Sequence, residues 1–269
     1  MVRHIFAALL LLATLPAAAR KTDTGFLDRT VAVAGTSYRY QVFVPNNWTR
    51  KQKWPVILFL HGSGERGETG LPQTDVGIGR AIRMGEKTTP FIVVMPQCRP
   101  EKTWTMLDME EQALAALDQA IKEFHGDPEH VYLTGLSMGG YGTWDMAARF
   151  PGRFAAYVPV CGGLQGKPDY PSIGGSLAKD ATVSDPYVET ARRIGKTPVW
   201  IFHGDSDTSV PVEESRKMAE ALKAAGANYK YTEYPGVGHN SWDKAYAEPE
   251  LVPWLLSQKL LKPQNNPVK

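Results

Sequence analysis

The sequence has little cysteine, almost no net charge, and no hydrophobic run long enough to cross a membrane. Its 269 residues include two cysteines, 30 basic and 28 acidic side chains, and the formal net charge is +2. Because no cluster of lysine and arginine creates a basic face, the sequence excludes a nucleic-acid-binding protein. The lack of CxxC pairs and of Cys/His clusters argues against a structural zinc site. A hydrophobic fraction of 43% indicates a globular protein with a substantial core.

The first residues have the layout of a secretory signal peptide. Arg3 supplies positive charge, residues 5–15 are apolar and uncharged, and residues 17–19 are the small alanines that a signal peptidase needs. A membrane anchor is the alternative, but this apolar stretch is too short for a hydrocarbon layer of about 30 Å. We therefore expect a signal peptide over residues 1–19, a mature domain over residues 20–269 without a membrane span, and a secreted or periplasmic location.

Short apolar runs alternate with helical patterns along the rest of the chain. Two early runs alternate polar and apolar residues, as expected for an antiparallel pair at a sheet edge; they cover residues 26–33 and 38–45. Later runs are more continuously apolar, as in parallel strands covered on both faces; they cover residues 55–62, 91–96, 130–137, 154–161, 197–204 and 229–235. Helical spacing predicts helices over residues 107–124, 212–225 and 251–261. We expect an α/β fold with a mostly parallel eight-stranded sheet and helices on both faces.

A polar, glycine-rich stretch at residues 162–185 fits neither the strand nor the helix pattern. It is too broken for a long helix and too short for a large lid. We therefore expect a small flap and an open site.

Residues 135–139 read GLSMG, which matches the GxSxG pattern. They follow a predicted strand and precede a helical stretch, the context in which a tight turn lifts the serine hydroxyl above a sheet. The helix N-terminus there also favours developing negative charge. A helix-capping serine is the alternative interpretation. The context favours Ser137 as a nucleophile.

A serine nucleophile needs a base, and the base needs an acid that orients it. Two histidines follow Ser137 in the sequence. His203 closes a predicted strand and is expected to be structural, whereas His239 lies in a glycine-rich loop after the last strand and is expected to be the general base. Asp205 and Asp207 both follow the strand that ends near His203, and their spacing alone does not decide which is the acid.

Two N–H donors are needed to bind the oxyanion of a tetrahedral intermediate. We expect one at Met138, directly after the nucleophile, and the other at Ser63, in the glycine-rich loop after the third strand. Trp104 and Trp242 lie near the expected site and suit an aromatic wall for a cinnamoyl ring or a sugar face. The alternative is that both rings only pack the loops.

Four motifs, in this order, together resemble the α/β-hydrolase superfamily: LHGSGERG, GLSMGGYGTW, HGDSDTSVP and GVGHNSW. The most similar branch is that of secreted single-domain esterases, described as dienelactone-hydrolase-like or prolyl-oligopeptidase-like and related to feruloyl and acetylxylan esterases. The resemblance runs from about Val42 to Trp254. It implies an α/β-hydrolase catalytic domain over residues 20–269 that uses no metal and no organic cofactor.

The same resemblance implies residue roles. It aligns Ser137 with the nucleophile and His239 with the base, and its pattern of HG, Asp and Val-Pro places the acid on Asp207. Dienelactone hydrolases proper have a cysteine nucleophile, where this sequence has serine. The superfamily's strand order places two central strands between the strands that precede Cys98 and Cys161, which implies free thiols.

The implied function is that of a secreted serine carboxylesterase that works through an acyl-enzyme. Its substrates would be small-molecule or polysaccharide-linked esters, including feruloyl or acetyl esters of plant polysaccharide. One alternative is a serine peptidase or amidase of the prolyl-oligopeptidase-like branch. Another is a non-catalytic binding protein on a hydrolase fold, but such proteins usually lack a member of the triad.

Overall fold

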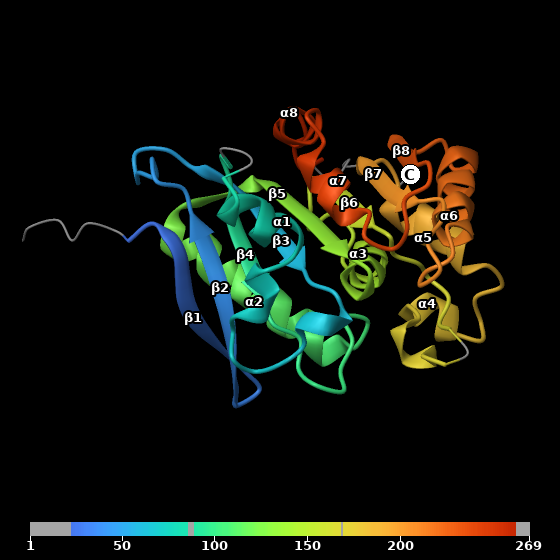
Figure 1. Ribbon diagram of the computed structural model, residues 1–269, viewed down its shortest axis with the longest axis horizontal. Coiled ribbons are helices and arrows are strands. Elements are labelled where there is room, and N and C mark those ends of the chain that lie inside the picture. Colours follow the sequence, from blue (N-terminus) through green and yellow to red (C-terminus); the bar gives the residue numbers. More distant parts are fainter. Residues whose placement is uncertain (1–22, 86–88, 168, 262–269) are drawn as a thin grey trace, which may run out of the picture.

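The computed structural model describes residues 23–85, 89–167 and 169–261, and its centre is an eight-stranded sheet (Figure 1). The strand order is β1-β2-β4-β3-β5-β6-β7-β8. The strands are β1 (Gly25–Val33), β2 (Thr36–Val44), β3 (Trp54–Leu60), β4 (Ile92–Pro96), β5 (Gly126–Leu136), β6 (Ala156–Val160), β7 (Val199–Gly204) and β8 (Tyr229–Tyr234). The expected signal peptide, residues 1–19, lies outside the described residues.

Strand direction follows the sequence patterns. The pairs β1–β2 and β2–β4 are antiparallel, and every other neighbouring pair is parallel. The inner strands β3, β4 and β6 are almost fully buried, which explains their continuous apolar residues. The predicted mostly parallel α/β sheet, with an antiparallel pair at one edge, is confirmed.

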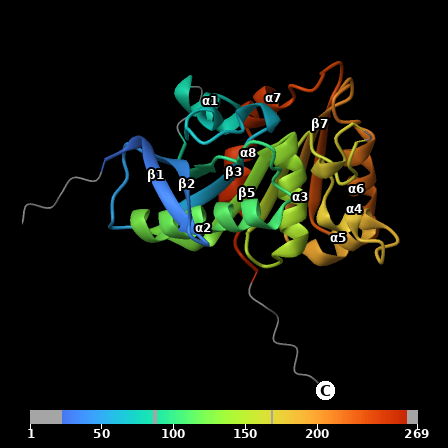
Figure 2. The same cartoon turned by 90° about the horizontal axis from the view of Figure 1, so that it is seen from below.

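Helices cover both faces of this sheet, with α1 and α7 on one side of the strands and α2 and α5 on the other (Figure 2). One face carries α2 (Leu107–Phe124), α3 (Met138–Arg149), α5 (Pro186–Ile194) and α6 (Glu213–Ala224), and the other carries α1 (Gly77–Arg83), α7 (Trp242–Ala247) and α8 (Leu251–Leu256). The alternation along β3 shows the cause. Leu58 and Leu60 belong to the core under the first group, and Ile57 and Phe59 belong to the core under the second.

The last predicted helix is shorter than expected. Helix α2 has the predicted bounds and α6 nearly so, but α8 ends at Leu256, so the prediction of helix to residue 261 is wrong. The chain beyond it bonds to the start of β5 instead: the Leu260 N–H donates to the Glu129 carbonyl and the Tyr132 hydroxyl to the Gln258 carbonyl. No helix among the described residues is long and apolar enough to cross a membrane.

Both cysteines are buried free thiols. Cys98 follows β4 and Cys161 follows β6, and strands β3 and β5 lie between them in the sheet. The expectation of free thiols is confirmed.

Candidate active site

Ser137 occupies a strained turn between β5 and α3. Its backbone angles are φ 52° and ψ −117°, in a region that residues other than glycine rarely adopt. The turn also packs too tightly for side chains at its glycines. A Cβ on Gly139 would lie 1.9 Å from the Leu60 carbonyl oxygen, and a Cβ on Gly135 would lie 2.3 Å from the Gly139 oxygen. The GLSMG sequence therefore reflects close backbone contact that holds the serine at the carboxyl end of the sheet.

The structure brings Ser137, His239 and Asp207 together as a continuous hydrogen-bonded series. His239 Nε2 lies 2.9 Å from Ser137 Oγ, and its Nδ1 lies 2.7 Å from Asp207 Oδ2. His239 comes from the loop between β8 and α7, and Asp207 from the loop after β7. An ionised Asp207 can only accept a hydrogen bond, so His239 carries its proton on Nδ1. His239 Nε2 is then left to accept the serine proton. The Asp207 side chain is fully buried and that of His239 is 25% exposed.

The Asp207 carboxylate is held in its ionised form. Burial opposes ionisation, but hydrogen bonds from His203, His239 and the Val210 backbone outweigh it and keep the pKa of Asp207 well below its ordinary value. His203 was expected to be structural, and its ring is fully buried at the end of β7. The sequence reasoning did not anticipate that its Nε2 would lie 3.1 Å from Asp207 Oδ2.

Asp205, the other candidate acid, points into a turn. Its Oδ1 accepts from the Ser206 hydroxyl and from the Gly236 N–H. This separates the two aspartates that sequence spacing alone could not.

The loop expected to supply an oxyanion donor runs beside the nucleophile. A Cβ on Gly62 would lie 3.8 Å from Ser137 Cβ, and Ser63 follows at the start of a short 3-10 helix, η1 (Ser63–Glu65). His61 anchors this loop from below: its Nδ1 donates to the Gly62 carbonyl, and its Nε2 accepts from the Cys98 N–H. Burial lowers the pKa of His61 to about 4, so the anchoring ring is neutral. The donor roles of Ser63 and Met138 stay predictions.

Trp104 does not line a substrate wall, which corrects the sequence expectation. Its side chain is fully buried, and its Nε1 donates to the His61 carbonyl at 3.0 Å. It also packs against Gly142 of α3, where a Cβ would lie 2.3 Å from Trp104 Cβ. Its indole therefore supports the loop after β3. Trp242 is different: its partly buried ring lies edge-on to His239, with ring centroids 5.4 Å apart.

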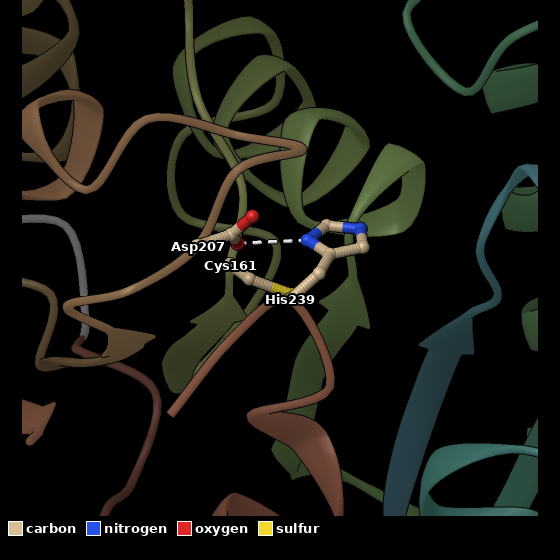
Figure 3. Close-up of side chains that lie close together, drawn as sticks. All are labelled: Cys161, Asp207 and His239. Carbon is tan, nitrogen blue, oxygen red and sulfur yellow. Dashed lines mark hydrogen bonds and ion pairs between the residues drawn. The ribbon is translucent and has the colours of Figure 1, made fainter. Parts of the chain in front are cut away.

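Cys161 lies beside Asp207 and His239, as Figure 3 shows. Ligand atoms of Cys161, Asp207 and His239 all lie within 4.8 Å of one another, the spacing of a possible metal site. The Asp207 oxygens already accept hydrogen bonds, Oδ1 from the Ser209 N–H and Oδ2 from His239. Burial raises the pKa of the Cys161 thiol to about 12, so the thiol stays protonated. Strand β6 adjoins β5 in the sheet, so Cys161 and Ser137 follow neighbouring strand ends.

Buried carboxylates fix the predicted flap, residues 162–185, to the body. Its elements within the described residues are η3 (Pro171–Ile173) and α4 (Ser176–Lys179). Glu214 of α6 accepts from the N–H groups of Leu164 and Gln165 at 2.7 and 3.1 Å. Asp145 of α3 accepts from the N–H and hydroxyl of Ser176. The flap is small, as expected, and these two carboxylates anchor it near its start and at Ser176.

The flap also contacts the turn at Ser137 through Tyr170, which Arg66 holds from a third segment; the sequence predicted neither residue. The Tyr170 hydroxyl lies 3.9 Å from Met138 Sδ, directly after Ser137. Arg66, in the loop after β3, donates from Nη1 to the same hydroxyl at 3.1 Å. The motif LHGSGERG contains Arg66, but nothing in the sequence pairs it with a tyrosine more than 100 positions away.

Comparison with known proteins places the chain in a family. Residues 37–248 match the dienelactone hydrolase family. An acyl-protein thioesterase 1 of Gibberella zeae is 25% identical over 93% of this chain and 95% of its own length. The crystal structure of a thermostable esterase has a TM-score of 0.70 and 31% identity, and the match covers 87% of this chain and 63% of that one. A ferulic acid esterase structure, at 20% identity and a TM-score of 0.60 over 86% of this chain and 97% of that one, shares the fold. The chain belongs to the dienelactone hydrolase family and is an esterase-type hydrolase with an α/β-hydrolase fold.

Proposed function

We propose that the protein is a serine carboxylesterase that hydrolyses carboxylic esters through an acyl-enzyme. The observation that carries the proposal is the hydrogen-bonded series from Ser137 Oγ through His239 to Asp207. A base within hydrogen-bond reach of the hydroxyl, itself oriented by a buried carboxylate, is the arrangement that activates a serine.

In the first half of the reaction, Ser137 Oγ attacks the ester carbonyl carbon while His239 Nε2 takes the hydroxyl proton. The Asp207 carboxylate stabilises the imidazolium that forms. The N–H groups of Met138 and Ser63 donate to the oxyanion. The carbon–oxygen bond to the alcohol then breaks, and the imidazolium returns its proton to the departing oxygen.

In the second half, water attacks the acyl-enzyme and gives a proton to His239. The carboxylic acid leaves when the bond to Ser137 Oγ breaks and the proton returns to that oxygen. Both halves use one base and one oxyanion site, so each residue serves twice.

For the substrate, we propose feruloyl or acetyl esters of the kind found on plant polysaccharide. Trp242 supports this choice, because its partly buried ring lies beside the catalytic base, where an aromatic acyl group or a sugar would stack. We further propose that residues 1–19 direct the chain out of the cytoplasm and are then removed.

The test compares the purified protein with Ser137→Ala on p-nitrophenyl acetate, p-nitrophenyl butyrate, methyl ferulate and a peptide p-nitroanilide. We expect turnover of esters by the wild type and a loss of at least about 10³-fold in the variant. Faster turnover of the anilide than of every ester would favour a peptidase. If wild type and variant are equally inert on all esters, the proposal fails.

A further inference from the structure

Both oxygens of the Asp207 carboxylate are fully used as acceptors. Oδ1 accepts from the N–H groups of Ser209 and Val210, at 2.7 and 2.9 Å. Oδ2 lies 2.7 Å from His239 Nδ1 and 3.1 Å from His203 Nε2. A carboxylate has about four lone-pair positions, so this one is satisfied on every side. His239 and His203 therefore both bond to Oδ2 of Asp207.

The neighbours of His203 determine where its ring carries a proton. Nε2 faces two acceptors, Asp207 Oδ2 at 3.1 Å and the Val210 carbonyl at 3.0 Å, so that nitrogen must bear hydrogen. Nδ1 lies 2.7 Å from the Ser215 hydroxyl on α6, which can donate to it. A single proton on Nε2 therefore satisfies the whole ring. The His203 side chain is fully buried, so no water competes for these positions.

We propose that His203 is a positioning residue that acts on the base through the acid, with its Nε2–H fixing Oδ2 of Asp207 and drawing off part of its negative charge. The proposal rests on the catalytic triad of the proposed function and places a positioning residue behind its acid. His203 reaches neither Ser137 nor the substrate side of His239, so its effect must pass through Asp207.

Because His203 and His239 share Asp207 Oδ2, loss of His203 should move the acidic limb of the pH–rate profile in a predictable direction. The His203 N–H stabilises the carboxylate charge and so weakens the pull of Oδ2 on the proton of His239. Without that donor, Oδ2 is a stronger acceptor and stabilises the imidazolium form of His239 more. Since the imidazolium cannot accept the serine proton, the acidic limb of the pH–rate profile then moves to higher pH.

Other titratable groups around Asp207 and His203 keep their charge through this range. Glu233 of β8 interacts electrostatically with His203, and hydrogen bonds from Arg216 and Tyr231 lower its pKa, so it stays ionised. Cys161 lies within 4.8 Å, and Tyr141 of α3 interacts electrostatically with the carboxylate. Burial raises the pKa of Cys161 to about 12 and that of Tyr141 well above its ordinary value. Neither changes charge between about pH 5 and 9, where a histidine base titrates. A moved acidic limb therefore reports on the two histidines and Asp207.

The experiment compares His203→Gln with His203→Met, two side chains of similar shape that differ in a terminal N–H donor. Both variants lose the imidazole Nδ1 that accepts from Ser215, but only the glutamine amide can donate to Asp207 Oδ2. With p-nitrophenyl acetate, we expect the acidic limb of kcat/KM to move up by about 0.5 to 1 pH unit in His203→Met. In His203→Gln it stays within about 0.2 unit of wild type.

Thermal unfolding of both variants measures their structural cost separately. A lower rate with an unmoved acidic limb in His203→Met overturns the proposal, because it shows a packing role alone. So does an equal movement of the limb in both variants.

If His203→Met does not fold, ¹⁵N NMR of the histidine-labelled wild type decides. The expected result is a protonated Nε2 on His203, and a ring protonated only at Nδ1 overturns the proposal. Ser137→Ala keeps the two failures apart: if it retains esterase activity, the proposed function itself is at fault.

Discussion

Asp205 and Asp207 lie on the same loop after β7, but only Asp207 directs its carboxylate at His239. Asp207 Oδ2 lies 2.7 Å from His239 Nδ1, whereas Asp205 Oδ1 accepts from the Gly236 N–H at 2.8 Å in a neighbouring turn. The difference arises from the backbone: Ser209 and Val210 donate their N–H groups to Asp207 Oδ1 and so turn its other oxygen toward His239.

These two aspartates form a matched pair for mutagenesis. Asp207→Asn keeps the shape but replaces an acceptor with an amide, so His239 is no longer held with its proton on Nδ1. We expect kcat for p-nitrophenyl acetate to fall by about 10³- to 10⁴-fold. Asp205→Asn should retain kcat/KM within about threefold. Equal losses in both variants would remove Asp207 from its assigned role.

His61 makes stability depend on pH. Its pKa is about 4 in the folded protein because the ring is buried, against an ordinary value of 6.5. The unfolded chain binds a proton there that the folded one refuses, so the contribution is complete above about pH 6.5 and is lost as pH falls to about 4. We expect this to lower the free energy of unfolding by about 3 kcal/mol across that window.

The control is His61→Asn, whose amide can still donate to the Gly62 carbonyl but does not titrate. Urea unfolding at a series of pH values gives the pH dependence of the free energy of unfolding for each protein. Between about pH 4 and 6.5 this free energy should change less steeply with pH in the variant, by an amount that corresponds to the uptake of up to one proton. Identical slopes would mean that His61 is not the group responsible.

Glu214 and Glu213 are adjacent on α6 but differ in environment. Glu214 accepts from two flap N–H groups and from the Tyr187 hydroxyl, whereas Glu213 pairs with Arg216 at the surface. Glu214→Ala leaves the Leu164 N–H and the Tyr187 hydroxyl buried without an acceptor, so we expect a loss of about 3 kcal/mol in unfolding free energy. Glu213→Ala should leave the midpoint of thermal unfolding unchanged.

Hydrogen exchange locates that effect. The amides of Leu164 and Gln165 should exchange faster in Glu214→Ala, and those of the central strands much less so. Uniform acceleration throughout the chain would argue against Glu214 as a local anchor of the flap.

Export can be tested by the mass of the protein recovered from outside the cytoplasm. We expect a chain that begins at Arg20, because the alanines at residues 17–19 suit a signal peptidase. Ala19→Arg should block processing and leave the longer chain in the membrane fraction. If the unmutated protein were recovered from the cytoplasm as the full-length chain, the proposed location would be contradicted.

Local sequence patterns were enough to predict the strands and the nucleophile turn. Alternating or continuous apolar runs report which faces of a strand are buried, and GLSMG encodes a tight backbone contact within one short segment. The acid needed a family resemblance, because Asp205 and Asp207 are equivalent in spacing and differ only in the direction their side chains take. The strand and turn patterns and the motif around Asp207 each lie within a short segment of the chain.

Contacts across the sheet were not predictable in this way. Trp104 was predicted to line an aromatic wall, with loop packing as the alternative, because the sequence does not show that Gly142, on another element, leaves room for its indole. His203, Cys161 and the Arg66–Tyr170 pair reach the site through strand order and loop packing. Nothing in the residue types near each of them indicates that contact.

We propose that His239 and Asp207 activate Ser137 as a nucleophile. The most direct measurement is reaction of the protein with a fluorophosphonate, followed by intact mass and peptide mapping. We expect one phosphonyl group, bonded to Ser137 Oγ with loss of fluoride, and slow labelling in His239→Ala. A protein that stays unmodified, or that carries the label on a different serine, would contradict it.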